Sequence, residues 1–70
     1  MTYQEVTEFY LGAGYIGWAS RIIPLKEDQV VRIGTKRYQV SKLSLQLSPS
    51  EENPLEIELA TLSVTLREIP

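Results

Sequence analysis

The sequence predicts a mainly β domain, a small antiparallel barrel of four to five strands of the SH3-like or OB-like kind, preceded by a short N-terminal helix. Two observations predict it. Residues 30–40 alternate between apolar and polar types on both sides of a glycine-containing turn, and two leucine-rich alternating stretches flank the polar loop 48–54. At 70 residues, the chain has room for a single core, so residues 1–70 form one domain.

Residues 3–11 are predicted to form the helix. Thr2 and Glu5 have the spacing of a capping box, apolar residues follow at helical intervals, and Gly12 stands where a helix commonly ends. A strand is the alternative for this segment, because its tyrosine, valine, threonine and phenylalanine residues all favour β structure.

The next elements are predicted to be strands. Residues 15–23 are rich in β-branched and aromatic types and end before Pro24, and Gly17 within them indicates a bulge or a close backbone approach. A turn follows over residues 24–29. Residues 30–40 then form a β-hairpin, with its turn at residues 34–36.

The C-terminal half is predicted to form two long strands that bend. The apolar alternation changes phase at residues 41–42 and again at residues 60–61. Side chains alternate strictly across a strand, so each change requires a bulge if one face is to stay buried. The two bulges are expected to lie opposite each other in an antiparallel pair and to form the corner of a barrel.

Composition excludes several classes of function. The chain has neither cysteine nor histidine, which removes thiol nucleophiles, imidazole bases and the usual zinc ligands. The N-terminus lacks the pattern of a signal peptide, and no apolar run reaches the ~18 residues that a membrane span requires. We therefore expect a soluble, cytoplasmic, non-enzymatic protein with no metal and no membrane partner.

Gly12, Gly14 and Gly17 have the G-x-G-x-x-G spacing, and "GAGYIG" resembles the start of extended short-chain dehydrogenases and sugar-nucleotide epimerases. That motif has meaning only within a βαβ unit, with an acidic residue about 20 positions further on. Here Pro24 follows too soon for the crossover helix, and Lys36 lies near the acidic position. No nucleotide cofactor and no catalytic residues are predicted.

The remaining candidate function is binding of another protein. Tyr15 and Trp18 are predicted to be apolar anchors, because aromatic residues dominate binding hot spots. A charged rim and one further aromatic are expected from the hairpin, namely Arg32, Lys36, Arg37 and Tyr38.

Two alternatives stay open. The basic hairpin, together with Lys42 and Tyr38, could hold single-stranded nucleic acid, although the net charge of −2 disfavours phosphate binding. The chain could instead be a structural homo-oligomer that pairs its exposed strands. Phosphate binding weakens steeply with salt and an apolar interface does not, so salt dependence separates protein from nucleic-acid partners.

The stretch "VVRIGTKRYQV", followed by a leucine-rich strand, a loop and a long final strand, resembles the small β-domains that complete the head–tail connection of tailed phages. The resemblance covers residues 30–66. It implies a structural or interaction role in an assembled particle. A small phage or mobile-element protein that inhibits a host factor fits the same sequence.

Overall fold

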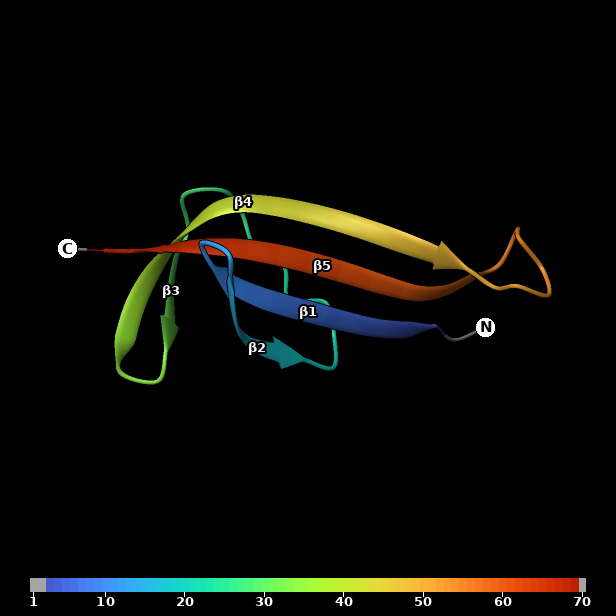
Figure 1. The fold of residues 1–70 in the computed structure, drawn as a ribbon, viewed down its shortest axis with the longest axis horizontal. Helices are drawn as coiled ribbons and strands as arrows, with labels where there is room; N and C mark the ends of the chain where they lie inside the picture. The colour runs from blue at the N-terminus through green and yellow to red at the C-terminus, as the bar shows by residue number, and fades with distance from the viewer. Residues whose placement is uncertain (1–2, 70) are drawn as a thin grey trace.

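The computed structural model describes residues 3–69, and within them the chain forms five strands and no helix. The strands make one sheet in the order β2-β1-β5-β4-β3, curled into a half-barrel (Figure 1). Their bounds are β1 Gln4–Leu11, β2 Gly14–Ala19, β3 Val30–Ile33, β4 Lys36–Pro49 and β5 Ile57–Glu68. The prediction of a mainly β chain is confirmed.

The N-terminal segment is a strand, so the helix predicted over residues 3–11 is wrong. Strand β1 buries Thr7 and Phe9, two residues apart, which is the period of a strand. All of β1 pairs with β5, and this tertiary pairing outweighs the weak helical preference of the sequence. Gly12 does adopt the left-handed conformation expected of it, at φ 60°, but in a hairpin turn.

The sheet is mixed, which corrects the expectation of a purely antiparallel barrel. β1 runs parallel to β5, whereas the β1–β2, β3–β4 and β4–β5 pairs are antiparallel. The first and last strands of the chain thereby become neighbours in the middle of the sheet. The two edges are left to the short strands β2 and β3.

Two tight hairpins have the same design. Gly12 and Ala13 join β1 to β2, and Gly34 and Thr35 join β3 to β4. Each glycine has a positive φ, 60° and 64° respectively, which the turns favoured in two-residue hairpins require. The predicted hairpin over residues 30–40 is confirmed, with Lys36 already in the strand.

Of the two predicted bulges, the one in β4 is confirmed. Its extra residue is Ser41, because Val40 pairs with Leu66 and Lys42 with Thr65. The bulge in β5 is at Glu58, so its placement at residues 60–61 was wrong, and the two bulges lie toward opposite ends of the β4–β5 pair. The small residue Ala60, and not the neighbouring Leu59, lies on the buried face at this point.

The core lies between the inner face of the sheet and the connector, residues 20–29, which crosses that face from β2 to β3. Ile22, Ile23 and Leu25 of the connector pack against the buried side chains of the sheet. Those side chains are Phe9, Tyr38, Val40, Leu62, Val64 and Leu66. The predicted strand 15–23 therefore ends at Ala19, and its last apolar residues cover the core.

Thr7 fastens the connector to the sheet. Its side chain is fully buried, and its hydroxyl donates a hydrogen bond to the Arg21 carbonyl oxygen at 2.6 Å. The same hydroxyl accepts one from the Ile23 N–H at 3.0 Å. Both backbone groups lie outside the strand ladders, so one side chain satisfies them together.

The connector covers only part of the sheet, because the molecule is elongated, with extents of 47 × 20 × 18 Å. β4 and β5 continue past β2 toward the loop 50–56 (Figure 1). The inner face of this extension has no layer over it. Figure 1 shows the connector passing behind the sheet, so the face toward the viewer is the outer face.

Candidate functional site

Strands β1 and β2 carry an aromatic surface on the outer face of the sheet. Thr7 and Phe9 point into the core, so the intervening Glu8 and the next residue, Tyr10, point outward. The residues paired with these two on β2 share that direction: Trp18 lies opposite Glu8, and Tyr15 lies opposite Tyr10. We call Glu8, Tyr10, Tyr15 and Trp18 the aromatic face.

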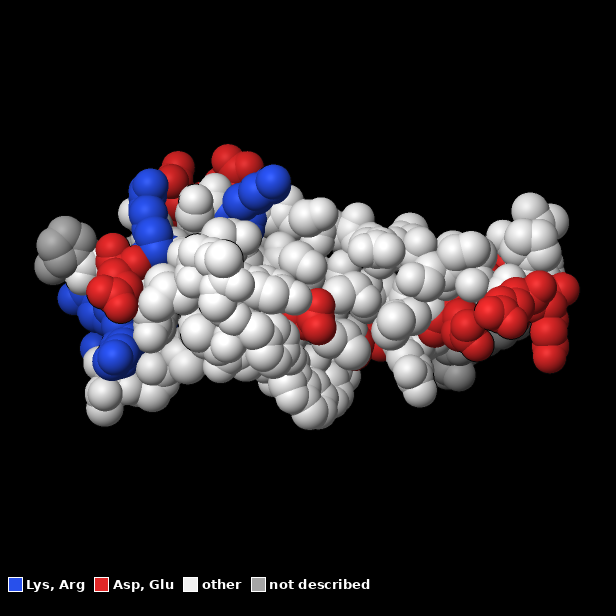
Figure 2. All heavy atoms as spheres, viewed as in Figure 1, with Lys and Arg blue, Asp and Glu red and all other residues white. Residues whose placement is uncertain are grey.

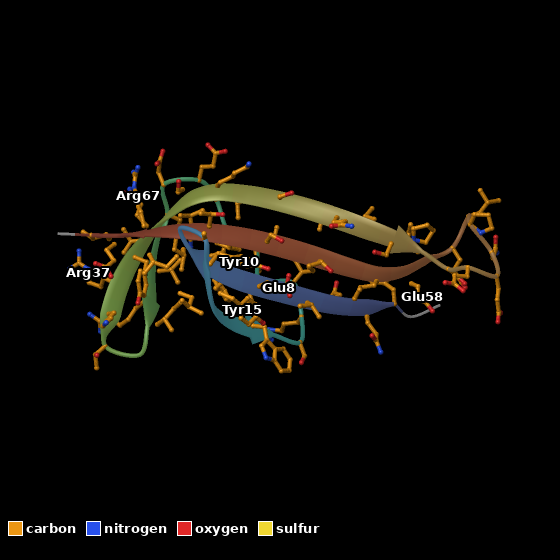
Figure 3. The ribbon with its side chains drawn as sticks, in the orientation of Figure 1. Glu8, Tyr10, Tyr15, Arg37, Glu58 and Arg67 are labelled. Atoms are coloured by element: carbon orange, nitrogen blue, oxygen red, sulfur yellow. The ribbon has the colours of Figure 1, made fainter. Side chains whose placement is uncertain are left out.

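The aromatic face is held in place by its own contacts. The rings of Tyr10 and Tyr15 meet edge to face, with centroids 5.4 Å apart. The Tyr10 hydroxyl donates a hydrogen bond to Glu8 Oε1 at 3.2 Å. Figure 3 shows these three side chains close together on β1 and β2. Trp18, by contrast, is 63% exposed.

A bulge in β2 adds to this surface. Gly17 pairs with Phe9 and Tyr15 with Tyr10, which leaves Ile16 as an extra residue. The bulge expected near Gly17 is therefore confirmed, one position earlier. Ile16 is exposed, so three of the four residues from Tyr15 to Trp18 present large apolar side chains to solvent on an edge strand.

The two tyrosines of the aromatic face have altered acidities. The pKa of Tyr10 is raised above its ordinary value of 10.0. The largest cause is partial desolvation, and the charge and hydrogen bond of Glu8 and the neighbouring Tyr15 contribute less. Partial desolvation and the Glu8 charge raise the pKa of Tyr15 as well. The neutral phenols are therefore favoured in the folded protein, and their contribution to stability is complete below pH ~10 and is lost as pH rises further.

We expect two of the four tyrosines to ionise at higher pH in the folded protein than in the unfolded one, as measured by ultraviolet absorbance. Replacing Glu8 with glutamine keeps the shape of the side chain and removes its charge. It should move both titrations back toward the ordinary tyrosine value. A titration curve unchanged by Glu8→Gln would contradict the contacts described for this surface.

The predicted charged rim lies elsewhere on the molecule. Arg32 is on β3, and Lys36 and Arg37 begin β4, at the opposite edge of the sheet from β2. β2 and β3 do not meet, so the half-barrel is open between them and these cations do not surround Trp18. Figure 3 shows Arg37 at the far end of the molecule from the loop 50–56.

Tyr38, one of the predicted contact residues, lies in the core. Its side chain is buried against the other core residues. The small part that reaches the surface lines a shallow hollow with Lys36, Arg37, Glu68 and Ile69. A ring in this position is not free to stack on a base or on a partner side chain.

Charge is divided along the long axis of the molecule. The loop 50–56 and the start of β5 contain Glu51, Glu52, Glu56 and Glu58 and no basic residue. On the face seen in Figure 2, the basic side chains lie toward the other end, with acidic side chains among them. Between the two ends, the outer face in Figure 2 carries few charges.

The acidic end also forms a hollow. Ser50 and the four glutamates line an open hollow, but residues 3–69 hold no group of three or more acidic side chains arranged to bind an ion. The same stretch of chain contains no helix with the length and apolar character needed to cross a membrane.

Comparisons with protein families, with curated proteins and with solved structures give no match for this chain. The choice of a candidate site therefore rests on the structure alone, and the aromatic face is the best-defined surface. Of the predicted contact residues, Tyr15 and Trp18 lie on the aromatic face, whereas Arg32, Lys36, Arg37 and Tyr38 lie together on the β3–β4 hairpin. The structure adds Glu8 and Tyr10, which a helix over residues 3–11 would not place beside Tyr15 and Trp18. Their alternation with Thr7 and Phe9 is the sequence pattern that indicates a shared outward face.

Proposed function

We propose that this protein is a non-enzymatic interaction module that binds another protein through the aromatic face. The observation that carries the proposal is the exposure of Trp18 beside an ordered Tyr10–Tyr15 pair. Tryptophan and tyrosine are enriched among the residues that dominate binding energy. A large apolar surface left open by a small domain is a typical mark of a contact site.

The position of the aromatic face on an edge strand supports the same proposal. β2 pairs with β1 on one side only, so its outward N–H and C=O groups are free. A partner strand could add to this edge while a pocket on the partner receives Trp18. Main-chain hydrogen bonds would supply affinity in such a complex, and the aromatic side chains would supply specificity.

The proposed setting is a phage or mobile genetic element. There the protein would act in the cytoplasm as an assembly component or as an inhibitor of a host factor. The resemblance of residues 30–66 to head–tail connection domains supports this setting. We further assign the half-barrel to the SH3-like or OB-like kind, on the basis of its size, its short edge strands and its curl.

The test is capture of a partner from the native host lysate, with tagged wild-type protein and a tagged Trp18→Ala variant at low and high salt. We expect one protein to be recovered with the wild type at both salt concentrations and to be absent with the variant. Recovery of the same protein by Trp18→Ala in equal amount would overturn the assignment of the site.

Trp18→Ala is expected to separate binding from stability. Because the side chain is mostly exposed, its loss should change the free energy of unfolding by less than ~1 kcal/mol, as measured in urea. Loss of a central aromatic contact weakens binding by about 2 kcal/mol or more, roughly 30-fold in the dissociation constant. Leu55→Ala, at an exposed loop position far from β2, is the control that should leave both quantities unchanged.

Single-stranded nucleic acid is the second candidate partner, and the gathering of basic residues at one end favours it (Figure 2). The burial of Tyr38 removes the aromatic platform that such binding commonly uses. Nucleic acid in the eluate that is lost at moderate salt would favour this alternative, because phosphate contacts release counterions.

A further inference from the structure

β4 has a free edge over its second half. β3 pairs only with the first residues of β4, up to Gln39, and the last bonds on that side join Val40 to Asp28 and Gln29. From residue 41 to residue 49, β4 pairs with β5 on one side, and no strand within residues 3–69 pairs with the other side. Figure 1 shows this part of β4 as the outer margin of the sheet. Long exposed edges of this kind readily pair with another strand.

The same stretch presents leucines that the fold does not cover. Leu43, Leu45 and Leu47 pair with Val64, Leu62 and Ala60, so they lie on the inner face of the sheet. The connector reaches Leu43, which packs against the core. Beyond it, Leu45 is 59% exposed and Leu47 is 51% exposed. A free edge and an uncovered apolar face therefore coincide in residues 41–49.

Charge at the two ends of β4 indicates which strand would fit. The end of β4 near Pro49 leads into the acidic loop, and the end near Lys36 lies among the basic residues. If a second copy runs antiparallel along β4, the acidic end of each copy lies beside the basic end of the other. A parallel arrangement would bring like charges together, which is unfavourable.

We propose that two copies of this chain pair antiparallel through residues 41–49 of β4 and form a symmetric dimer with one continuous sheet. This goes beyond the proposed function, because it uses the opposite edge of the sheet from the aromatic face and requires no other protein. In a two-fold symmetric dimer, both copies use their β4 edge in the same interface. Neither copy then has a free β4 edge to bind a third, so the assembly stops at two.

Full overlap of the two free edges fixes the register. The midpoint of residues 41–49 is Leu45, which would lie opposite the partner's Leu45. Leu43 would lie opposite the partner's Leu47, and the polar residues between them would pair on the outer face. The axis runs perpendicular to the sheet, so both inner faces point the same way and the uncovered leucines of the two copies form one apolar strip.

The absence of cysteine from the sequence allows a direct test of this register. In a Leu45→Cys variant, the two new thiols would lie opposite each other across the dimer axis, at a spacing that a disulfide can bridge. We expect mild oxidation at micromolar concentration to give a covalent dimer in high yield. Leu55→Cys, 93% exposed on the loop, is the matched control and should give little. Equal yields from the two variants would overturn the proposal.

Sedimentation of the untagged protein over a range of concentrations provides the second measurement. We expect the wild type and Trp18→Ala to sediment as dimers, and Leu45→Lys to raise the dissociation constant by about 5-fold, because it places two like charges directly opposite each other at the axis. Leu45 is exposed in the single chain, so far-ultraviolet circular dichroism should show that the variant still folds. A wild type that is monomeric at every concentration, or a Leu45→Lys variant that dimerises as well as the wild type, would overturn the proposal.

Discussion

Replacing Leu66 with alanine is expected to remove a large share of the protein's free energy of unfolding. Leu66 is only 2% exposed and packs with Val40 and Val64 in the central part of the core. Loss of a buried leucine costs about 2–5 kcal/mol. The free energy of unfolding of natural proteins is roughly 0.05–0.15 kcal/mol per residue. In a chain this short, the loss is therefore a large share of the total.

The control for this prediction is the same substitution at Leu55. That side chain lies on the loop between β4 and β5 and is almost fully exposed. Its removal should change the free energy of unfolding by no more than about 0.5 kcal/mol. Urea unfolding followed by circular dichroism measures both variants. Similar midpoints for Leu66→Ala and Leu55→Ala would mean that the core is not where the structure places it.

Thr7→Val is expected to have the second largest effect, although it keeps the volume and branching of the side chain. The hydroxyl holds both the Arg21 carbonyl oxygen and the Ile23 N–H against β1. Without it, two backbone groups near the core lose their partner, and each unsatisfied group costs about 1–3 kcal/mol when buried. The connector should then separate from the sheet more readily than the strands separate from one another.

Thr7→Ser is the matched variant, because it keeps the hydroxyl and removes one buried methyl group. It should cost only about 1 kcal/mol. Hydrogen exchange of the Ile23 amide measures the local effect directly. We expect its protection to fall strongly in Thr7→Val and little in Thr7→Ser. Equal protection in the two variants would show that the hydroxyl does not fasten the connector.

The parts of the fold that could be predicted are those in which local sequence and tertiary environment agree. The hairpin around Gly34 and the bulge at Ser41 follow from alternation and turn chemistry, which act over a few residues. β1 could not be assigned in the same way, because its strand conformation depends on pairing with β5, at the other end of the sequence. The β5 bulge was misplaced because Ala60 is too small to mark the buried face.

The candidate site was predictable only as single residues. Trp18 and Tyr15 stand out by type, and their spacing shows that they share a strand. Alternation along β1 places Glu8 and Tyr10 on one face, but their position beside Tyr15 and Trp18 depends on the β1–β2 register, including the extra residue Ile16. The charged rim was expected because basic residues are concentrated in the hairpin, but the order of the sheet carries β3 and β2 to opposite edges.

The central claim is that Trp18 is the contact by which this protein binds its partner. Trp18 is the only tryptophan in the chain, so its fluorescence reports on this one site. The captured partner is prepared with a non-fluorescent tryptophan analogue and titrated into the protein while the emission of Trp18 is followed. We predict that the free protein emits like a solvent-exposed indole and that the emission shifts to shorter wavelength as the complex forms. Saturable binding that leaves the Trp18 emission unchanged would contradict the account.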